Sequence, residues 1–436
     1  MIGLTGLAAE RALALTAVLR SAGHQALLVG GCVRDLLLGV PPKDFDIATD
    51  ATPAELVRLF PGADLVGAHF GVVLVDGVEI ATFRSDGAYA DGRRPDEVRF
   101  ETSPAADASR RDFTINGLFF DPVTGRVLDF VGGERDLSAG VVRAIGDPAA
   151  RFAEDRLRLL RAVRFAARYG FALEAGTLTA IAHQAPAVMR VAAERCRDEL
   201  NRILTQGGAR RGWELLDETG LLLQLLPEIS AMKGVAQPPE FHPEGDVWTH
   251  TLLMLEGMRE PSLTLAWGVL LHDVAKPPTF RVADRIRFDG HDEMGARMAS
   301  TILLRLRQSA DVVERVVDLV ARHLEWMHVR QMKESKLRRF LRREWFAEHL
   351  ELHRLDCASS NRRRENYDFA VERLAALPAE ALRPPALVNG DDLIALGMTP
   401  GAAFKRILAA VEDAQLEGRV ATRAQALDLA RDFGGC

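Results

Sequence analysis

The chain has 436 residues, 48% of them hydrophobic, and a formal net charge of −6. This length and composition predict several domains with their own cores, and the charge excludes a generally basic protein that binds any polyanion. The sequence shows no signal-peptide pattern and no apolar run of about 18 residues that would span a membrane, so we expect a soluble cytoplasmic protein with no membrane partner. Its four scattered cysteines, Cys32, Cys196, Cys357 and Cys436, predict reduced thiols.

The first motif is a glycine turn between a strand and a helix. A short apolar run at residues 25–29 ends on Gly30 and Gly31 and leads into a helix-like segment at residues 33–38. Backbone amides at the start of that helix could face a phosphate, and Arg34 would add positive charge there.

Two aspartates one residue apart form the second motif. If residues 44–48 form a strand, the side chains of Asp44 and Asp46 point the same way, while Phe45 points into the core. Paired carboxylate oxygens are ligands that suit Mg²⁺.

A third carboxylate follows in a predicted hairpin, residues 71–75 and 78–83, whose turn is Asp76-Gly77. Glu79 lies among apolar neighbours and is either a solvent-facing strand residue or a partner of the two aspartates. Two-metal nucleotidyl transfer needs carboxylates that converge on the α-phosphate and the attacking hydroxyl. This requirement favours Glu79 as the third catalytic carboxylate.

The β pattern disappears from about residue 147. Asp147-Pro148 opens one long helical stretch that is predicted to run to Tyr169, with Gly170 as its C-cap, and further helices extend to about residue 227. Pro238-Pro239 then precede a histidine-rich helical region. After Arg383 the tail is predicted to hold a helix from Gly401 to about Glu417 and another from Thr422.

Four motifs in this order resemble those of bacterial class II tRNA nucleotidyltransferases, the CCA-adding enzymes: residues 30–35, Asp44 with Asp46, residues 110–118 and residues 154–158. The resemblance implies an α+β protein, with a nucleotidyltransferase-type mixed α/β head followed by an all-α neck, an HD-domain body and a tail. The implied boundaries are 1–140 for the head, 141–235 for the neck and the start of the body, 236–383 for the HD-type domain and 384–436 for a tRNA-contacting tail. The implied reaction is template-free addition of C, C and A to the tRNA 3′ end from CTP and ATP, with Mg²⁺ as cofactor.

The resemblance also implies a role for each motif residue. Gly31 and Arg34 would hold the triphosphate, Asp44 and Asp46 the metal ions, and Arg111 the nucleotide. Asp155, Arg158, Arg161 and Arg164 would form the edge that selects the base.

The chemistry of that edge follows from its groups. A carboxylate only accepts and a guanidinium only donates hydrogen bonds, so an Asp beside an Arg matches cytosine and adenine, which pair an amine donor with a ring-nitrogen acceptor. Uracil and guanine would leave the same groups desolvated and unpaired. On a helix Asp155 and Arg158 would lie at positions i and i+3, close enough to act together, while Arg161 and Arg164 turn off that face.

The histidine-rich region resembles HD-type metal phosphohydrolases. The implied ligands are His250, His272, Asp273, His291, His323 and Asp356. Mixed imidazole and carboxylate ligands suit a pair of transition-metal ions of unknown identity. The first ion would take His250, His272, Asp273 and Asp356, and His291 with His323 would complete a second site; His242, His328, His349 and His353 have no assigned place. Such a site could hydrolyse a phosphodiester or cyclic phosphate, and so trim damaged 3′ ends that the transferase repairs.

Several alternatives remain open from the sequence. Enzymes that add only CC or only A share the motifs and differ mainly in a flexible head loop, here placed at residues 85–97. A poly(A) polymerase is disfavoured because residues 64–73 have the form typical of the tRNA enzymes. In a different class of function, the head is a non-catalytic RNA-binding module and the HD domain is the only catalyst.

Overall fold

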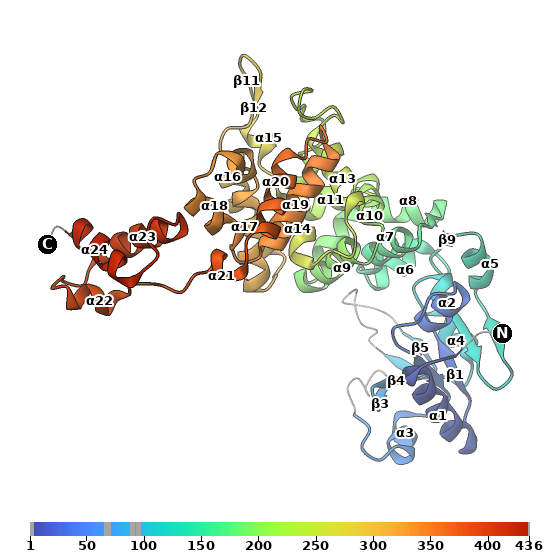
Figure 1. The fold of residues 1–436 in the computed structure, drawn as a ribbon. Coiled ribbons are helices and arrows are strands. Elements are labelled where there is room, and N and C mark those ends of the chain that lie inside the picture. Colours follow the sequence, from blue (N-terminus) through green and yellow to red (C-terminus); the bar gives the residue numbers. More distant parts are fainter. Residues whose placement is uncertain (1–3, 65–70, 88–91, 93–96, 435–436) are drawn as a thin grey trace. The chain divides into compact units, whose positions relative to one another are not determined.

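The structure is a computed structural model that describes residues 4–64, 71–87, 92 and 97–434 (Figure 1). The chain divides into two compact units, Met1–Ser230 and Ala231–Cys436. The predicted division into four parts stays a prediction. Parts of the two segments that bear on the type of nucleotide addition, 64–73 and 85–97, lie outside the described residues.

A six-stranded mixed sheet forms the head of the first unit, and this confirms the α/β prediction (Figure 1, blue to cyan). Its order is β3 (Val72–Val75), β4 (Val78–Thr82), β2 (Asp46–Thr49), β1 (Ala26–Val29), β7 (Leu118–Asp121) and β8 (Arg126–Asp129). The pair β2–β4 is parallel, and the other pairs are antiparallel. The remaining head elements are α1 (Leu7–Ser21), α2 (Gly31–Leu37), α3 (Pro53–Leu59), β5 (Arg84–Asp86), β6 (Val98–Phe100), α4 (Pro104–Ser109), the 3-10 turn Thr114–Asn116 and α5 (Gly133–Ser138).

The predicted hairpin is confirmed. Strands β3 and β4 pair directly, and both turn residues have positive φ, +50° at Asp76 and +82° at Gly77. This is the geometry of the primed two-residue turns that match the twist of paired strands, which is why Asp-Gly is favoured there.

The strand that carries the aspartates begins later than predicted. Strand β2 starts at Asp46, which pairs with Val29, so the prediction that Asp44 lies within the strand is wrong. Phe45 is nevertheless buried, as the alternation requires. The side-chain alternation therefore extends beyond the hydrogen-bonded ladder.

The long helix predicted from residue 147 is broken. Helix α6 (Pro148–Glu154) ends at Asp155, whose backbone is extended, and α7 (Arg158–Tyr169) begins three residues later. Gly170 closes α7 in the left-handed conformation, with φ of +68°, so the predicted C-cap is confirmed. The remaining helices of this unit are α8 (Ala175–Gln184), the 3-10 helix Ala185–Arg190, α9 (Ala193–Thr205), α10 (Ala209–Glu218), α11 (Leu221–Leu225) and α12 (Pro227–Ser230).

The prediction that β structure ends near residue 147 is wrong in two places. A short parallel pair joins β9 (Val141–Val142) to β10 (Ala172–Leu173), and β11 (Arg281–Val282) pairs with β12 (Ile286–Arg287). Two-residue strands give too short an alternation for the sequence pattern to reveal them.

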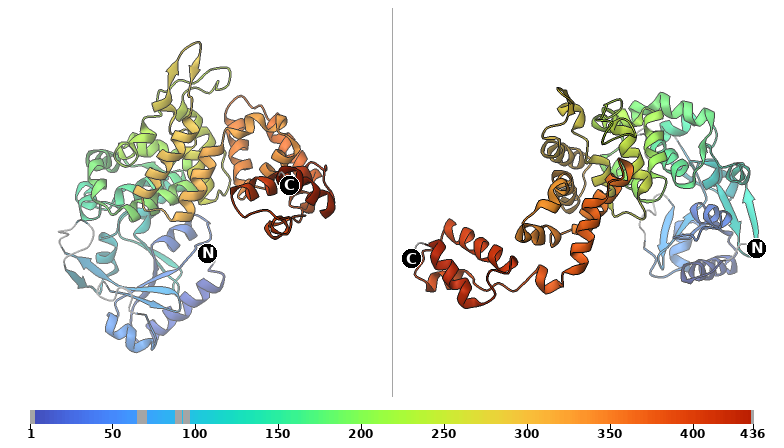
Figure 2. Two further views of the ribbon diagram at one scale, coloured as in Figure 1. Left: turned by 90° about the vertical axis from the view of Figure 1, so that its left-hand side faces the viewer. Right: turned by 45° about the horizontal axis from the view of Figure 1, so that its top comes forward.

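The second unit is otherwise helical. Its body contains α13 (Val247–Gly257), α14 (Leu263–Leu271), α15 (Lys276–Thr279), α16 (His291–Arg305), α17 (Ala310–Arg322), the 3-10 helix Glu325–Gln331, α18 (Glu334–Leu341), α19 (Phe346–Ser359), α20 (Glu365–Ala376) and α21 (Ala379–Leu382). Its last three helices, α22 (Gly390–Ala395), α23 (Ala402–Leu416) and α24 (Arg423–Gly434), pack around a core of their own (Figure 2, red). Within the described ranges, no helix is both long and apolar enough to cross a membrane.

Candidate functional site

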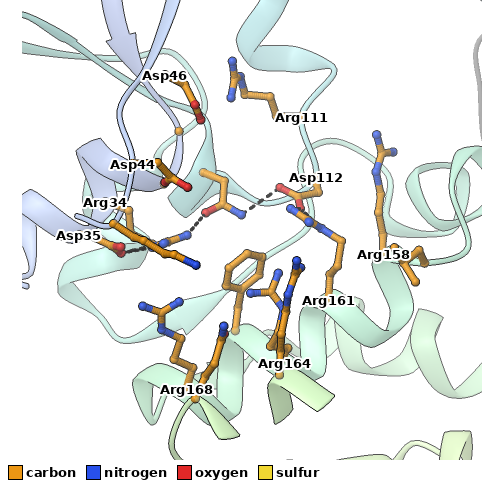
Figure 3. A pocket seen from close by; sticks show the side chains of 18 of the residues that line it. Arg34, Asp35, Asp44, Asp46, Arg111, Asp112, Arg158, Arg161, Arg164 and Arg168 are labelled. Carbon is orange, nitrogen blue, oxygen red and sulfur yellow. Dashed lines mark hydrogen bonds and ion pairs between the residues drawn. The ribbon is translucent and has the colours of Figure 1, made fainter. Parts of the chain in front are cut away.

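A cleft with a volume of about 770 Å³ lies in the first unit, between the head and helices α7 and α9 (Figure 3). The structure brings together around it every head and neck residue singled out from the sequence except Glu79. These are Gly31, Arg34, Asp44, Asp46, Arg111, Asp155, Arg158, Arg161 and Arg164. Residues more than a hundred positions apart in the sequence therefore share one solvent-accessible space.

The aspartates gather negative charge at one side of the cleft. Burial, together with the nearby charges of Glu79 and Asp44, raises the pKa of Asp46 to about 6, although Arg111 opposes the rise. Glu79 is exposed and does not line the cleft. It immediately precedes Ile80, which pairs with Ile47 in the parallel strands, so Glu79 lies next to Asp46. Since a divalent cation would relieve the repulsion between these carboxylates, the oxygen donors fit Mg²⁺.

The glycine turn brings the backbone close to an arginine. Gly30 has φ of +76°, and a Cβ placed there would lie 3.1 Å from Nη1 of Arg111. Arg111 is held by Asp107, which accepts from its Nη2 at 2.8 Å and from its Nε at 3.1 Å. A residue without a side chain at position 30 therefore lets the Arg111 guanidinium lie against the turn.

Arg34 is buried and held by contacts from several side chains. It donates to Asp35 from Nη2 at 2.7 Å and to Oδ1 of Asn116 at 2.5 Å, and its guanidinium lies 4.8 Å from the ring centre of Tyr169. The Tyr169 hydroxyl donates to the same Asp35 oxygen at 2.8 Å. The predicted phosphate-side arginine is thus held from both the head and helix α7.

A hydrogen-bonded chain continues from Arg34 to the neck (Figure 3). Asn116 donates from Nδ2 to Asp112 at 3.0 Å, and Asp112 pairs with Arg161 at 2.6 Å. Although burial opposes it, Arg161 and Asn116 hold the pKa of Asp112 below its usual range. Sequence reasoning gave Asp112 and Asn116 no role, yet their place inside the motif at residues 110–118 was a signal for one.

The prediction that Asp155 and Arg158 lie at positions i and i+3 of one helix is wrong. Because Asp155 lies outside both helices, its carboxylate turns toward α9 and forms two bonds with Arg195, at 2.9 and 3.2 Å. Arg158 instead pairs with Glu154, at 2.5 Å. Both Asp155 and Arg158 still line the cleft.

Helix α9 contributes two residues that sequence reasoning missed. Besides Arg195, it carries buried Glu199, which accepts from Arg164 at 2.5 Å. Their signal was weak, because an Arg and a Glu four positions apart on a helix are ordinary surface residues in most sequences.

A second cluster lies in the body. The cluster consists of the six residues predicted as HD-type ligands, and its inner histidines share one orientation. Nδ1 of His272, His291 and His323 lies 2.8, 2.7 and 2.7 Å from the carbonyl oxygens of Val269, Phe288 and Val320 respectively. A carbonyl only accepts, so each Nδ1 carries the proton and the Nε2 of each neutral imidazole is unprotonated, as a metal ligand requires. Nε2 of His291 and Nε2 of His323 lie 3.2 Å apart.

Asp273 lies between two groups of histidines. Its Oδ2 is 3.1 Å from Nε2 of His272, while its Oδ1 is 3.5 Å from Nε2 of His291 and 3.8 Å from Nε2 of His323. Lys276 also contacts Oδ2, at 2.7 Å. One carboxylate with an oxygen toward each group is the arrangement expected of a ligand that bridges two ions.

His250 and Asp356 complete the first group. Nε2 of His250 lies 3.2 Å from Oδ1 of Asp356. Within the described part of the chain, Nε2 of His250 and Nε2 of His272 are buried without a partner in hydrogen-bond geometry. These bare nitrogens and the carboxylates beside them fit divalent metal ions.

Three segments of the chain match known family models. Residues 26–143 match the poly A polymerase head domain, residues 170–233 the probable RNA and SrmB-binding site of polymerase A, and residues 246–355 the HD domain.

Curated relatives match about half of the chain. The chain is 42% identical over 209 residues to the CCA-adding enzyme of Limosilactobacillus fermentum, covering 47% of this chain and 52% of that protein. It is 37% identical over 254 residues to the CCA-adding enzyme of Bacillus pumilus, covering 57% and 60%. The matched region thus spans about half the length of the curated relatives.

Solved structures match along nearly the whole chain. The Bacillus stearothermophilus CCA-adding enzyme in complex with CTP superposes with a TM-score of 0.75 at 27% identity, over 98% of this chain and 99% of that one. The Thermotoga maritima CCA-adding enzyme complexed with a tRNA shares the fold, with a TM-score of 0.62 at 18% identity over 97% and 95%. The resemblance drawn from the motifs is confirmed: the chain carries a poly A polymerase head domain and an HD domain, and it has the fold of the CCA-adding enzymes.

Proposed function

We propose that the chain is a tRNA nucleotidyltransferase that adds C, C and A to the tRNA 3′ end from CTP and ATP. The single observation that supports this most is the cleft in which the carboxylates of Asp44 and Asp46 lie beside the glycine turn and a set of arginines. The likeness to CCA-adding enzymes, including one in complex with CTP, supports the same proposal. A tRNA substrate would also agree with the predicted cytoplasmic location.

One set of cleft residues would bind the triphosphate and the metal ion, and another would bind the base. The turn at Gly31 and the guanidiniums of Arg34 and Arg111 would bind the triphosphate, since fixed donors suit phosphate oxygens. Asp44 and Asp46, with Glu79 beside them, would hold Mg²⁺. Bound there, Mg²⁺ would supply charge neutralisation at the α-phosphate and activation of the 3′ hydroxyl.

The proposed base-selecting edge includes Arg195 as well as Asp155 and Arg158. Asp155 accepts two bonds from Arg195, which fix the carboxylate in one orientation while leaving lone pairs for an exocyclic amine. Arg158, held by Glu154, would supply the donor for the ring nitrogen. In this arrangement Arg195 is a positioning residue, and Arg158 acts beside Asp155 without being paired to it.

Replacing Asp155 with Ala should lower kcat/KM for CTP and ATP by about 10- to 100-fold, because a charged acceptor for the base amine is lost. The ratio of kcat/KM for CTP and ATP to kcat/KM for UTP and GTP should fall. Single-nucleotide extension of tRNA with each of the four triphosphates measures both effects, and an unaltered order of preference would remove Asp155 from the selecting edge.

Replacing Arg195 with Met should raise KM for CTP and ATP by about 10-fold, because the Asp155 carboxylate loses its two-bond support. Arg190→Met is the matched control, since Arg190 is exposed and outside the cleft. Arg195→Lys should recover part of the affinity. Equal KM values for Arg195→Met and the control would show that Asp155 does not depend on Arg195.

The experiment that tests the whole proposal uses tRNA ending before the CCA, after one C and after CC. Each nucleotide is supplied singly and the products are sequenced. CCA addition predicts C on the first two substrates and A on the third. Addition of C alone, of A alone or of a long A tract would identify instead a CC-adding enzyme, an A-adding enzyme or a poly(A) polymerase.

We propose a metal-dependent phosphohydrolase as a second activity, in the body. The observation that favours it is the Asp273 carboxylate between two groups of oriented imidazoles. The cluster opens into a cavity of about 950 Å³ that Arg330 and Arg363 also line, and their charge suits a phosphate ester. Trimming of damaged RNA 3′ ends is the use that would connect this activity to the first.

A further inference from the structure

His242 and Glu244 lie just before helix α13 and contact the histidine cluster, but neither is among the six predicted ligands. Glu244 accepts from Nδ1 of His250 at 2.7 Å and from Nδ1 of His242 at 2.9 Å, through the same oxygen, Oε1. The rings of His242 and His250 pack edge to face with their centres 4.9 Å apart. Glu244 thus connects two imidazoles at the edge of the proposed metal site.

The contact of Glu244 repeats a pattern seen at the other ligands. Backbone carbonyls hold Nδ1 of His272, His291 and His323, whereas Nδ1 of His250 is held by the Glu244 carboxylate. In each case the acceptor fixes the proton on Nδ1 and leaves Nε2 bare. Outer carboxylates that orient a histidine in this way also make it a stronger ligand.

His242 has the same orientation as the recognised ligands. Because a carboxylate holds its Nδ1, its free nitrogen is Nε2, and its side chain lines the cavity that His272, Asp273 and His323 also line. The rings then follow one another as His242, His250, His272, His323 and His291, with neighbouring centres 4.9 to 5.5 Å apart. His242 is therefore the first imidazole of a continuous arc.

The Glu244 side chain is buried, and one of its oxygens has no hydrogen-bond partner among the described residues. Its side chain is only 7% exposed, and among the described residues its second oxygen, Oε2, is buried with no hydrogen-bond partner. A buried carboxylate with an unsatisfied oxygen is costly unless charge or a ligand compensates it. The cost is consistent with a functional role of the segment 242–244.

We infer that Glu244 is a positioning residue of the metal centre, which orients His250 and His242, and that His242 is an additional nitrogen ligand of that centre. The inference rests on the proposed metal site in the body. It concerns two residues outside the six ligands that the HD-type pattern supplies.

Titration of the full chain with Co²⁺, followed by visible absorption and isothermal calorimetry, tests the inference. All variants carry Asp44→Asn and Asp46→Asn, so that the head site does not compete for the ion. Glu244→Gln keeps the shape but removes the charge, and it should weaken Co²⁺ binding by about 10- to 100-fold. His242→Ala should weaken it at least several-fold and change the absorption spectrum, because an imidazole leaves the coordination shell.

Glu240→Gln is the matched control, since Glu240 is exposed and lies in the same segment. Thermal unfolding of each variant shows whether it has folded, and His242→Gln gives a second substitution at that position. Affinity of Glu244→Gln equal to that of Glu240→Gln would overturn the role of Glu244. An unchanged spectrum and affinity in both His242 variants would overturn the role of His242. If the control itself binds no Co²⁺, the proposed metal centre fails, and this inference with it.

Discussion

Replacing Asp44 or Asp46 with Asn should lower the rate of nucleotide addition about 10³-fold, because the neutral amide no longer offsets the charge of a bound cation at the triphosphate. Both side chains line the cleft, and the pKa of Asp46 is raised to about 6 by burial and by the charges of Glu79 and Asp44. A divalent ion would relieve the repulsion between these carboxylates, which adds to the effect of burial on this pKa. Rates of CTP addition to tRNA under single-turnover conditions measure the effect.

Asp76→Asn is the control, since Asp76 is an exposed turn residue outside the cleft and loses the same charge. Asparagine also tolerates the positive φ of that position. If Asp44→Asn and Asp46→Asn add nucleotides as fast as the control, the head is not the catalyst. That result would leave the alternative in which the head only binds RNA and the body carries the only activity.

The cleft could be anticipated from the sequence because its parts are local. A strand, a glycine turn and a helix come within residues 26–37, and Asp46 begins the strand that pairs with the first of these. Short-range patterns of this kind specify both the element and the direction of its side chains. The structure therefore gathers the predicted head residues, apart from Glu79, around one space.

The base-selecting edge could not be derived in the same way. Treating residues 147–169 as one helix placed Asp155 and Arg158 on one face, but Asp155 has an extended backbone and its Oδ1 accepts from the amide of Leu157 at 3.1 Å. Asp is favoured where a helix starts, so its presence at position 155 is compatible with a break in the helix before α7. The partner from α9, Arg195, lies forty residues away in the sequence, and no local pattern points to such a contact.

The body shows the same division between local pattern and tertiary contact. The resemblance supplied the six ligands in their order along the sequence, and the structure brings them together. His242 has no place in that order, so sequence reasoning gave it no role. Its connection to His250 runs through Glu244, and only the folded structure brings these three side chains together. Hydrogen-bond partners of a ligand are invisible to a pattern built from the ligands alone.

Replacing His272 and Asp273 together with Ala should abolish metal binding in the body and any hydrolysis of phosphodiesters or cyclic phosphates, while nucleotide addition continues. Loss of one outer partner of a ligand already costs about 10- to 100-fold in metal affinity, so loss of two ligands, one of them shared by both histidine groups, should cost more. Metal content after dialysis and hydrolysis of a model phosphodiester measure the first effect, and CTP addition to tRNA measures the second.

His328→Ala is the control for this pair, because it removes an exposed imidazole of the same region. Loss of Asp273 is expected to have the larger effect, because its two oxygens face different histidines. Its Oδ2 also lies 2.7 Å from Nζ of Lys276. Removing it leaves the Lys276 ammonium buried without its carboxylate, so unfolding must be measured alongside activity. A folded double variant that still hydrolyses phosphodiesters would place that activity outside the histidine cluster, whereas loss of both activities in a folded protein would show that the two sites depend on each other.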